Sequence, residues 1–274
     1  MNFFEQFVHF LQFEAPKPTP FGWFHLMFIG IFTALSIFLA IRFRNATNKQ
    51  NKIILLVTWI ILFLFEAYKQ LVYSFSFENG VATWDYQWYA FPFQFCSSPI
   101  FILPFAIFIK NEKIQDYFTS FLSFFAIFGG LITFILPEAP FNTHLLGVQI
   151  QTMVHHGLMI AIGVYLIVRN RHKLNIKYYL KGLLVFVILL AIAMIMNETM
   201  IFAAAGEEFN MFYISRHFAN TMPVLSMIYA STPYIVFLLS YIFGFALIGL
   251  IFFGISKLIV FLTGLAKSKN KKSV

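Results

Sequence analysis

The chain contains one cysteine, Cys96, and two adjacent histidines, His155 and His156, residue types that can perform nucleophilic chemistry. A thiol beside an imidazole supplies the nucleophile and the general base that acyl transfer through a thioester requires. Successive residues of a helix point about 100° apart, so the two histidines cannot have the same role. A single cysteine among apolar residues is also commonly a small buried hydrophobe, and that alternative stays open.

The residues around Cys96 predict an unusual helix start. Pro92 suits the first position of a helix, which places Cys96 just past the first turn, where the helix dipole favours a thiolate. Pro99 cannot donate a hydrogen bond to the carbonyl of Phe95 and clashes with it, so we expect the helix to bend beside the cysteine.

Further ionisable side chains lie within apolar stretches, where they are costly in a membrane and mark functional sites. Glu66 and Lys69 are three residues apart and share a helix face, so they can pair, although such a pair could serve only to tie helices together. The helical rise of about 1.5 Å per residue puts these groups at similar depth in one half of a bilayer. The candidates for supporting the site or lining its cavity are Glu66, Lys69, Gln94, His25, His155, Asn197 and Glu198.

The elements that must position these residues follow from composition. Of the 274 residues, 60% are hydrophobic and 11% are charged, whereas soluble domains carry about 25% charged residues. This excludes a soluble globular protein and a disordered one. Seven stretches are long and apolar enough to span a membrane, and they are residues 22–43, 53–75, 92–109, 117–136, 148–168, 182–203 and 233–253, the last with an extension towards Leu262. The predicted fold is therefore an all-α membrane protein, a seven-transmembrane helix bundle over residues 21–262.

The positions of the basic residues predict an orientation. Most of the 19 Lys and Arg residues fall in the first, third and fifth loops and in the C-terminal tail. Because basic residues accumulate in cytoplasmic loops, we expect the N-terminus outside and the C-terminus in the cytoplasm, with a multi-pass placement in the cell membrane. The same rule explains the net charge of +8, so we expect no nucleic-acid partner.

Three segments flank or interrupt the spans. Residues 1–20 predict an amphipathic helix on the outer membrane surface followed by a Pro-rich break, with a disordered tail as the alternative. Residues 263–274 form a basic cytoplasmic tail. The outer segment 204–232 has apolar stretches but no complete span, and it could fold over the cavity as a lid carrying Arg216 and His217, or be an ordinary surface loop.

Several short motifs, in the expected order along nearly the whole chain, resemble the YwaF-like bacterial integral membrane proteins, which are related to the eukaryotic transmembrane protein 164. The likeness rests on Phe91-Pro92-Phe93-Gln94-Phe95-Cys96, His156-Gly157 and His25-Leu26, and more weakly on Asn210-Met211-Phe212-Tyr213 and Thr232-Pro233-Tyr234. The resemblance implies a seven-helix fold and phospholipid acyltransferase activity, with Cys96 as the nucleophile and His156 as the base. Gln94 stands where the family has a histidine, and it could donate a hydrogen bond to a developing oxyanion.

We therefore expect a membrane-embedded phospholipid acyltransferase or transacylase that acts on membrane phospholipids or lysolipids without a cofactor or a metal. Glu66 or Glu198 could orient the imidazole. Two alternatives stay open. One is a lipid esterase that uses the same Cys96–His156 dyad, and the other is a transporter or receptor whose Glu66, Lys69 and Glu198 relay protons or a solute. No particular protein partner is indicated.

Overall fold

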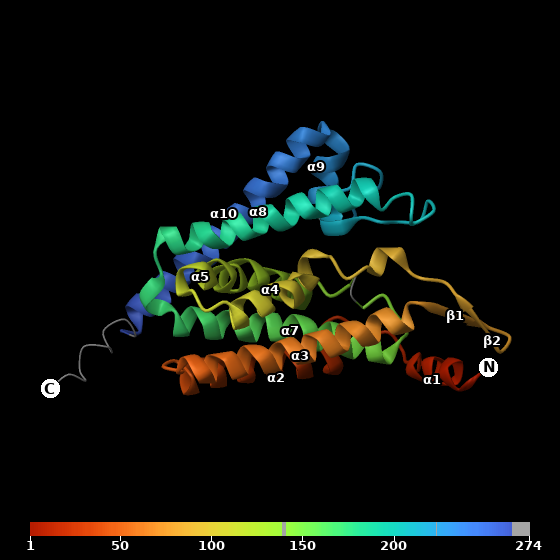
Figure 1. Ribbon diagram of the computed structural model, residues 1–274, viewed down its shortest axis with the longest axis horizontal. Helices are drawn as coiled ribbons and strands as arrows, with labels where there is room; N and C mark the ends of the chain where they lie inside the picture. Colours follow the sequence, from red (N-terminus) through yellow and green to blue (C-terminus); the bar gives the residue numbers. More distant parts are fainter. Residues whose placement is uncertain (139–140, 223, 265–274) are drawn as a thin grey trace.

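The computed structural model describes residues 1–138, 141–222 and 224–264. Helices that run roughly along the long axis of the molecule make up most of it (Figure 1). The longest are α2 (Trp23–Arg42), α3 (Asn48–Val72), α7 (Leu146–Arg169), α8 (Ile176–Thr199) and α10 (Tyr234–Leu262). A further continuous helix consists of α5 (Glu112–Phe121), the π-helical turn η3 (Leu122–Ala126) and α6 (Ile127–Ile135).

Among the described residues, six helices are long and apolar enough to cross a membrane, so the chain is a multi-pass helical membrane protein by length and composition. They correspond to six of the seven predicted spans, and the predicted extension of the last span to Leu262 is confirmed. Within the described part of the chain, Ile, Leu and Phe side chains of α2, α3 and α10 remain largely exposed. A lipid environment explains this exposure, because acyl chains solvate apolar side chains that water would not.

The third predicted span is shorter than expected. Its helix begins with the 3-10 turn η2 (Phe95–Ser97) and continues as α4 (Ser98–Phe108), whereas Pro92 lies outside any helix. The expected helix start at Pro92 is therefore wrong, and Cys96 lies in the first turn. The expected bend at Pro99 is also wrong, since Pro99 stands at the beginning of α4, where its missing N–H costs no helical hydrogen bond. The proline inside the helix is Pro104.

The continuous helix of α5, η3 and α6 and the helix α7 form the centre of the bundle. More than two thirds of the span Glu112–Ile135 is buried inside the protein, as is a similar share of Leu146–Arg169. Helices α2 and α3 pack on one side of α7, and α8 packs along α5. Helix α7 carries both adjacent histidines, so these side chains lie in the central part of the bundle.

One end of the bundle carries a β-hairpin that the sequence did not predict. Strands β1 (Phe75–Glu78) and β2 (Val81–Trp84) pair antiparallel through a turn at Asn79 and Gly80, both with positive φ (51° and 77°), as the tightest hairpin turns require. The short helix α1 (Phe3–Leu11) lies at the same end (Figure 1). The predicted helix in residues 1–20 is therefore present, and it exposes Phe3 and Phe10 while Val8 is buried, as expected for an amphipathic helix. Its location on a membrane surface stays a prediction.

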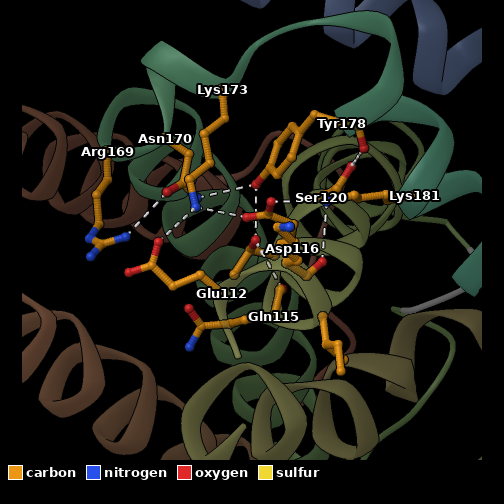
Figure 2. A network of polar contacts seen from close by, with 12 residues as sticks. Glu112, Gln115, Asp116, Ser120, Arg169, Asn170, Lys173, Tyr178 and Lys181 are labelled. Carbon is orange, nitrogen blue, oxygen red and sulfur yellow. Dashed lines mark hydrogen bonds and ion pairs between the residues drawn. The ribbon is translucent and has the colours of Figure 1, made fainter. Parts of the chain in front are cut away.

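The opposite end carries a network of paired polar groups that joins α5, α7 and α8 (Figure 2). Asp116 binds Lys173 at 2.8 Å and Lys181 at 3.0 Å. The Tyr178 hydroxyl donates to Thr119 Oγ1 at 3.0 Å and accepts from Asn170 at 3.2 Å. We call these residues, with Ser120 and Arg169, the basic-end network.

The remaining elements are short. Turn η1 (Trp88–Ala90) precedes η2, and turn η4 (Arg171–Lys173) joins α7 to α8. The segment between α8 and α10 contains η5 (Met211–Tyr213) and α9 (Leu225–Ser231). In the predicted basic tail, residues 265–274 lie outside the described residues.

Candidate functional site

Two adjacent glycines of α6, Gly129 and Gly130, contact the Cys96 thiol and the backbone of His156, respectively. The Cys96 thiol donates a long hydrogen bond to the carbonyl oxygen of Gly129, with Sγ 4.0 Å from it. A Cβ added to Gly130 would lie 2.5 Å from the backbone oxygen of His156. Only glycine allows α7 to approach α6 this closely, since any side chain would strike backbone that cannot rotate away. The glycine pair thus lets α7, which carries the histidines, pack closely against the part of α6 that the Cys96 thiol contacts.

The glycine after His156 has a similar packing role. A Cβ on Gly157 would overlap the ring of Phe32, which lies against this position from α2. In the His156-Gly157 motif, the glycine therefore leaves room for the ring of Phe32 directly beside the histidine. This packing fixes the distance between α2 and α7 beside the histidines.

The two histidines have different hydrogen-bond partners. His155 Nε2 lies 2.9 Å from the carbonyl oxygen of Cys96, and His156 Nδ1 lies 2.7 Å from that of Thr152. A carbonyl oxygen only accepts, so these contacts assign the proton of His155 to Nε2 and that of His156 to Nδ1. The lone pair of His156 is then at Nε2, where it can accept a proton. The expectation that the histidines differ in role agrees with this geometry.

Accessibility separates them further. His155 is only 2% exposed, and its Nδ1 is buried without a hydrogen-bond partner among the described residues. Cys96 and His156 each keep some accessible surface although they lie among the central helices. His155 therefore holds the backbone of Cys96, while Cys96 and His156 retain surface on which a substrate can react.

The pairing of Glu66 with Lys69, expected from their spacing, is present in α3. Lys69 Nζ lies 2.8 Å from Glu66 Oε1, and Gln70 donates to the same oxygen at 2.8 Å. The other oxygen, Glu66 Oε2, is buried without a partner in the described structure. We call Cys96, His155, His156, Glu66 and Lys69 the reactive cluster.

Gln94 and Asn197 hold a loop and do not present free polar atoms to the cluster. Gln94 accepts from the N–H of Phe212 at 2.9 Å and donates to the carbonyl of Asn210 at 3.0 Å. Asn197 accepts from the N–H of Met211 at 2.7 Å and donates to its carbonyl at 3.0 Å. Each of these side-chain amides thus both donates to and accepts from the backbone of residues 210–212. The oxyanion role considered for Gln94 would require it to release these bonds.

Glu198 lies at the end of α8 in a partly exposed group with the two residues proposed for a lid. Its Oε2 accepts from Arg216 at 2.7 Å and lies 3.1 Å from His217 Nε2. The carboxylate is 40% exposed and belongs to this surface group, so it is not placed to orient His156. Arg216 and His217 therefore fasten the segment after η5 to α8.

His25 is fully buried near the start of α2. Its Nδ1 accepts from the N–H of Phe21 at 3.1 Å, and its ring packs against Phe134 and Phe141. Accepting at Nδ1 places the proton at Nε2, which has no partner among the described residues. His25 is thus a neutral histidine in an aromatic environment beside α7.

Two tyrosines near Cys96 were not identified from the sequence. Tyr213 at the end of η5 and Tyr241 in α10 both lie close enough to Cys96 for their charges to interact. Tyr213 belongs to the motif Asn210-Met211-Phe212-Tyr213, which was the available signal. Tyr241 stands among many aromatic residues of α10, and its spacing does not distinguish it from them.

The fold and this interior polar cluster define a multi-pass helical membrane protein with a site built between its helices. A family model described as the TMEM164 family matches residues 20–257, and the chain belongs to this family. Neither the comparison with curated proteins nor that with solved structures finds a match. The match includes every residue of the reactive cluster and the segment from Asn210 to Tyr213.

Proposed function

We propose that this protein is a membrane-embedded acyltransferase that moves an acyl chain from a phospholipid through a thioester on Cys96. The observation that carries the proposal is the packing of Cys96 and His156 against Gly129 and Gly130, with the lone pair of His156 at Nε2. A free imidazole nitrogen and an accessible thiol are the two groups that nucleophilic acyl transfer needs.

The reaction would proceed in two halves. His156 Nε2 takes the thiol proton as Cys96 Sγ attacks the ester carbonyl, and the tetrahedral intermediate expels the lysolipid alkoxide, which takes the proton back from the imidazole. The hydroxyl of an acceptor lysolipid then gives its proton to His156 and attacks the thioester, and the Cys96 sulfur leaves and is reprotonated. The net change is one ester exchanged for another, with no redox partner.

The remaining cluster residues support the charges that develop. The ammonium of Lys69, held by Glu66, would offset part of the charge that develops on the Cys96 sulfur during attack. His155 holds the carbonyl of Cys96 and so orients the residue that carries the nucleophile. In a site with little water these interactions are stronger than at a surface.

A lipid substrate suits the position of the site. The cluster lies between helices whose outer faces are apolar, so a substrate that diffuses within the membrane can reach it without crossing water. With the basic loops in the cytoplasm, the end carrying β1 and β2 faces outside, and the cluster takes lipids from the outer half of the cell membrane. Phospholipids and lysolipids are then the natural donor and acceptor.

The test uses purified protein in vesicles that contain a phospholipid with a labelled acyl chain and an unlabelled lysolipid. We expect Cys96→Ala to abolish transfer and His156→Ala to lower it by about 10²- to 10⁴-fold, the usual contribution of a general base. His9→Ala, in the exposed helix α1, is the matched histidine control and should transfer normally. Hydroxylamine should release label bound to Cys96 in the native protein.

Transfer that persists in both Cys96→Ala and His156→Ala would overturn the proposal. Vesicles without lysolipid separate transfer from ester hydrolysis, because an esterase would release labelled fatty acid at the same rate with or without the acceptor.

A further inference from the structure

The segment that ends at Tyr213 is held in a strained shape. Phe212 and Tyr213 have φ values of 58° and 56°, a left-handed conformation that costs a bulky residue about 1–3 kcal/mol and concentrates at functional sites. Gln94 and Asn197 bind the backbone just before it, and Asn220 donates to the carbonyl of Tyr213 at 2.6 Å. Three side-chain amides therefore maintain a conformation that the chain alone would avoid.

This conformation places Tyr213 at a cavity beside the segment that carries Cys96. The cavity has a volume of about 140 Å³ and is lined by Tyr89, Gln94, Glu208, Asn210, Tyr213 and Thr221. Gln94, two residues before Cys96, accepts from the N–H of Phe212, and the Phe212 ring lies 5.8 Å from the ring of Phe95. Tyr213 thus borders the cavity close to the residues that flank Cys96.

The hydroxyl of Tyr213 is available as a donor. Burial, followed by the nearby Cys96 and Glu208, raises the pKa of Tyr213 to about 12, so the phenol keeps its proton at neutral pH. No hydrogen bond of this hydroxyl occurs within the described residues. By contrast, the hydroxyl of Tyr234 already has a partner in the same segment, since it donates to the carbonyl of Ile214 at 2.8 Å.

We propose that Tyr213 is a catalytic residue whose hydroxyl donates a hydrogen bond to the carbonyl oxygen of the acyl ester as that oxygen becomes the oxyanion of the tetrahedral intermediate on Cys96. This inference rests on the acyl transfer proposed above and adds the group that stabilises its transition state. No covalent bond to Tyr213 forms or breaks, and its proton stays on the phenol. An oxyanion donor must point at the position of the developing charge, which explains why the segment is clamped so firmly.

The experiment compares Tyr213→Phe with Tyr234→Phe in the vesicle transfer assay. Removing one oxyanion donor should lower kcat by about 10²- to 10³-fold with little change in KM. Tyr234→Phe removes a hydroxyl that only anchors the loop, so it should keep kcat within about twofold while it lowers thermal stability slightly. A normal kcat in Tyr213→Phe, with Cys96→Ala inactive, would overturn this inference and leave the acyl transfer intact.

Two further variants separate a donor from a packing residue. Fluorotyrosine at position 213 has a more acidic phenol of nearly the same shape, so a donor role predicts a kcat at or above the native value and far above that of Tyr213→Phe. If fluorotyrosine instead gives the low kcat of Tyr213→Phe, or if Tyr241→Phe alone causes the loss, the assignment to Tyr213 is wrong. Retained hydroxylamine-sensitive labelling of Cys96 in Tyr213→Phe, at a reduced rate, would support it.

Discussion

In the basic-end network Asp116 binds two lysines and Tyr178 both donates and accepts, whereas in the reactive cluster Glu66 and His155 each keep a buried polar atom without a partner among the described residues. The first region lies where α7 ends and α8 begins (Figure 2), and the second joins the first turn before α4, the C-terminal part of α3 and the interior of α7. Among the described residues Arg169 Nε is also without a partner at the basic end, but both terminal nitrogens of that guanidinium donate hydrogen bonds.

The two regions differ in whether their buried polar groups have hydrogen-bond partners, and this difference suggests which region serves stability and which serves chemistry. A buried polar group without a partner costs about 1–3 kcal/mol, so a stable protein retains it only where something else depends on it. The hydrogen bonds and ion pairs of the basic-end network hold α5, α7 and α8 together, and we expect no further role for them. The unpaired atoms belong to Glu66, which binds Lys69, and to His155, which binds the backbone of Cys96.

The largest effect should come from the scaffold of the cluster. Gly130→Ala would put a Cβ 2.5 Å from the backbone oxygen of His156, and overpacking of this kind costs about 1–3 kcal/mol or more. Because α7 must move, acyl transfer should fall as well. Unfolding in detergent and the vesicle transfer assay measure the two effects.

Gly254→Ala is the matched control for that change. Nothing lies within 4 Å of a Cβ added there in α10, and alanine in a helix is favoured over glycine by up to about 1 kcal/mol. Its stability should be unchanged or higher and its transfer rate normal. If Gly130→Ala behaved like this control, the glycine scaffold would not be needed.

The next effect concerns the histidine that holds Cys96. His155→Leu removes the donor to the carbonyl of Cys96, and we expect transfer to fall by about 10- to 100-fold because the nucleophile is misplaced. Stability should change by only about 1 kcal/mol, the net value of one hydrogen bond. If His155→Leu lost stability but transferred acyl chains normally when folded, His155 would have a structural role only.

The smallest effect on chemistry is expected at the paired end. Asp116→Asn weakens the contacts to Lys173 and Lys181, and hydrogen bonds to charged groups contribute about 1.5–3 kcal/mol before allowance for partial exposure. The unfolding midpoint should drop modestly, and the transfer rate per folded molecule should stay within about twofold of native. A large loss of rate without loss of stability would remove the distinction between the two regions.

Much of the architecture followed from apolar stretches because spanning a membrane demands length and hydropathy that few other folds require. The pairing of Glu66 with Lys69 followed from helical spacing, since both residues are on one helix. The helix start near Cys96 was misjudged by three residues, because the Gln94 side chain binds the backbone of Asn210 and Phe212 and the helical turn begins only after it, at Phe95. That contact joins residues more than 100 positions apart, and local sequence contains no trace of it.

The sequence by itself determined a helical membrane protein, the residue types of a Cys and His site, and the motifs shared with its family. Only the tertiary structure decided that Gly129 contacts the Cys96 thiol while Gly130 packs against the backbone of His156, that Glu198 pairs with Arg216, and that Tyr213 and Gln94 line one cavity. The physical reason is that these two kinds of information act over different distances along the chain. Hydropathy and helical period act along the chain, whereas close helix packing and hydrogen bonds between helices depend on which distant surfaces meet.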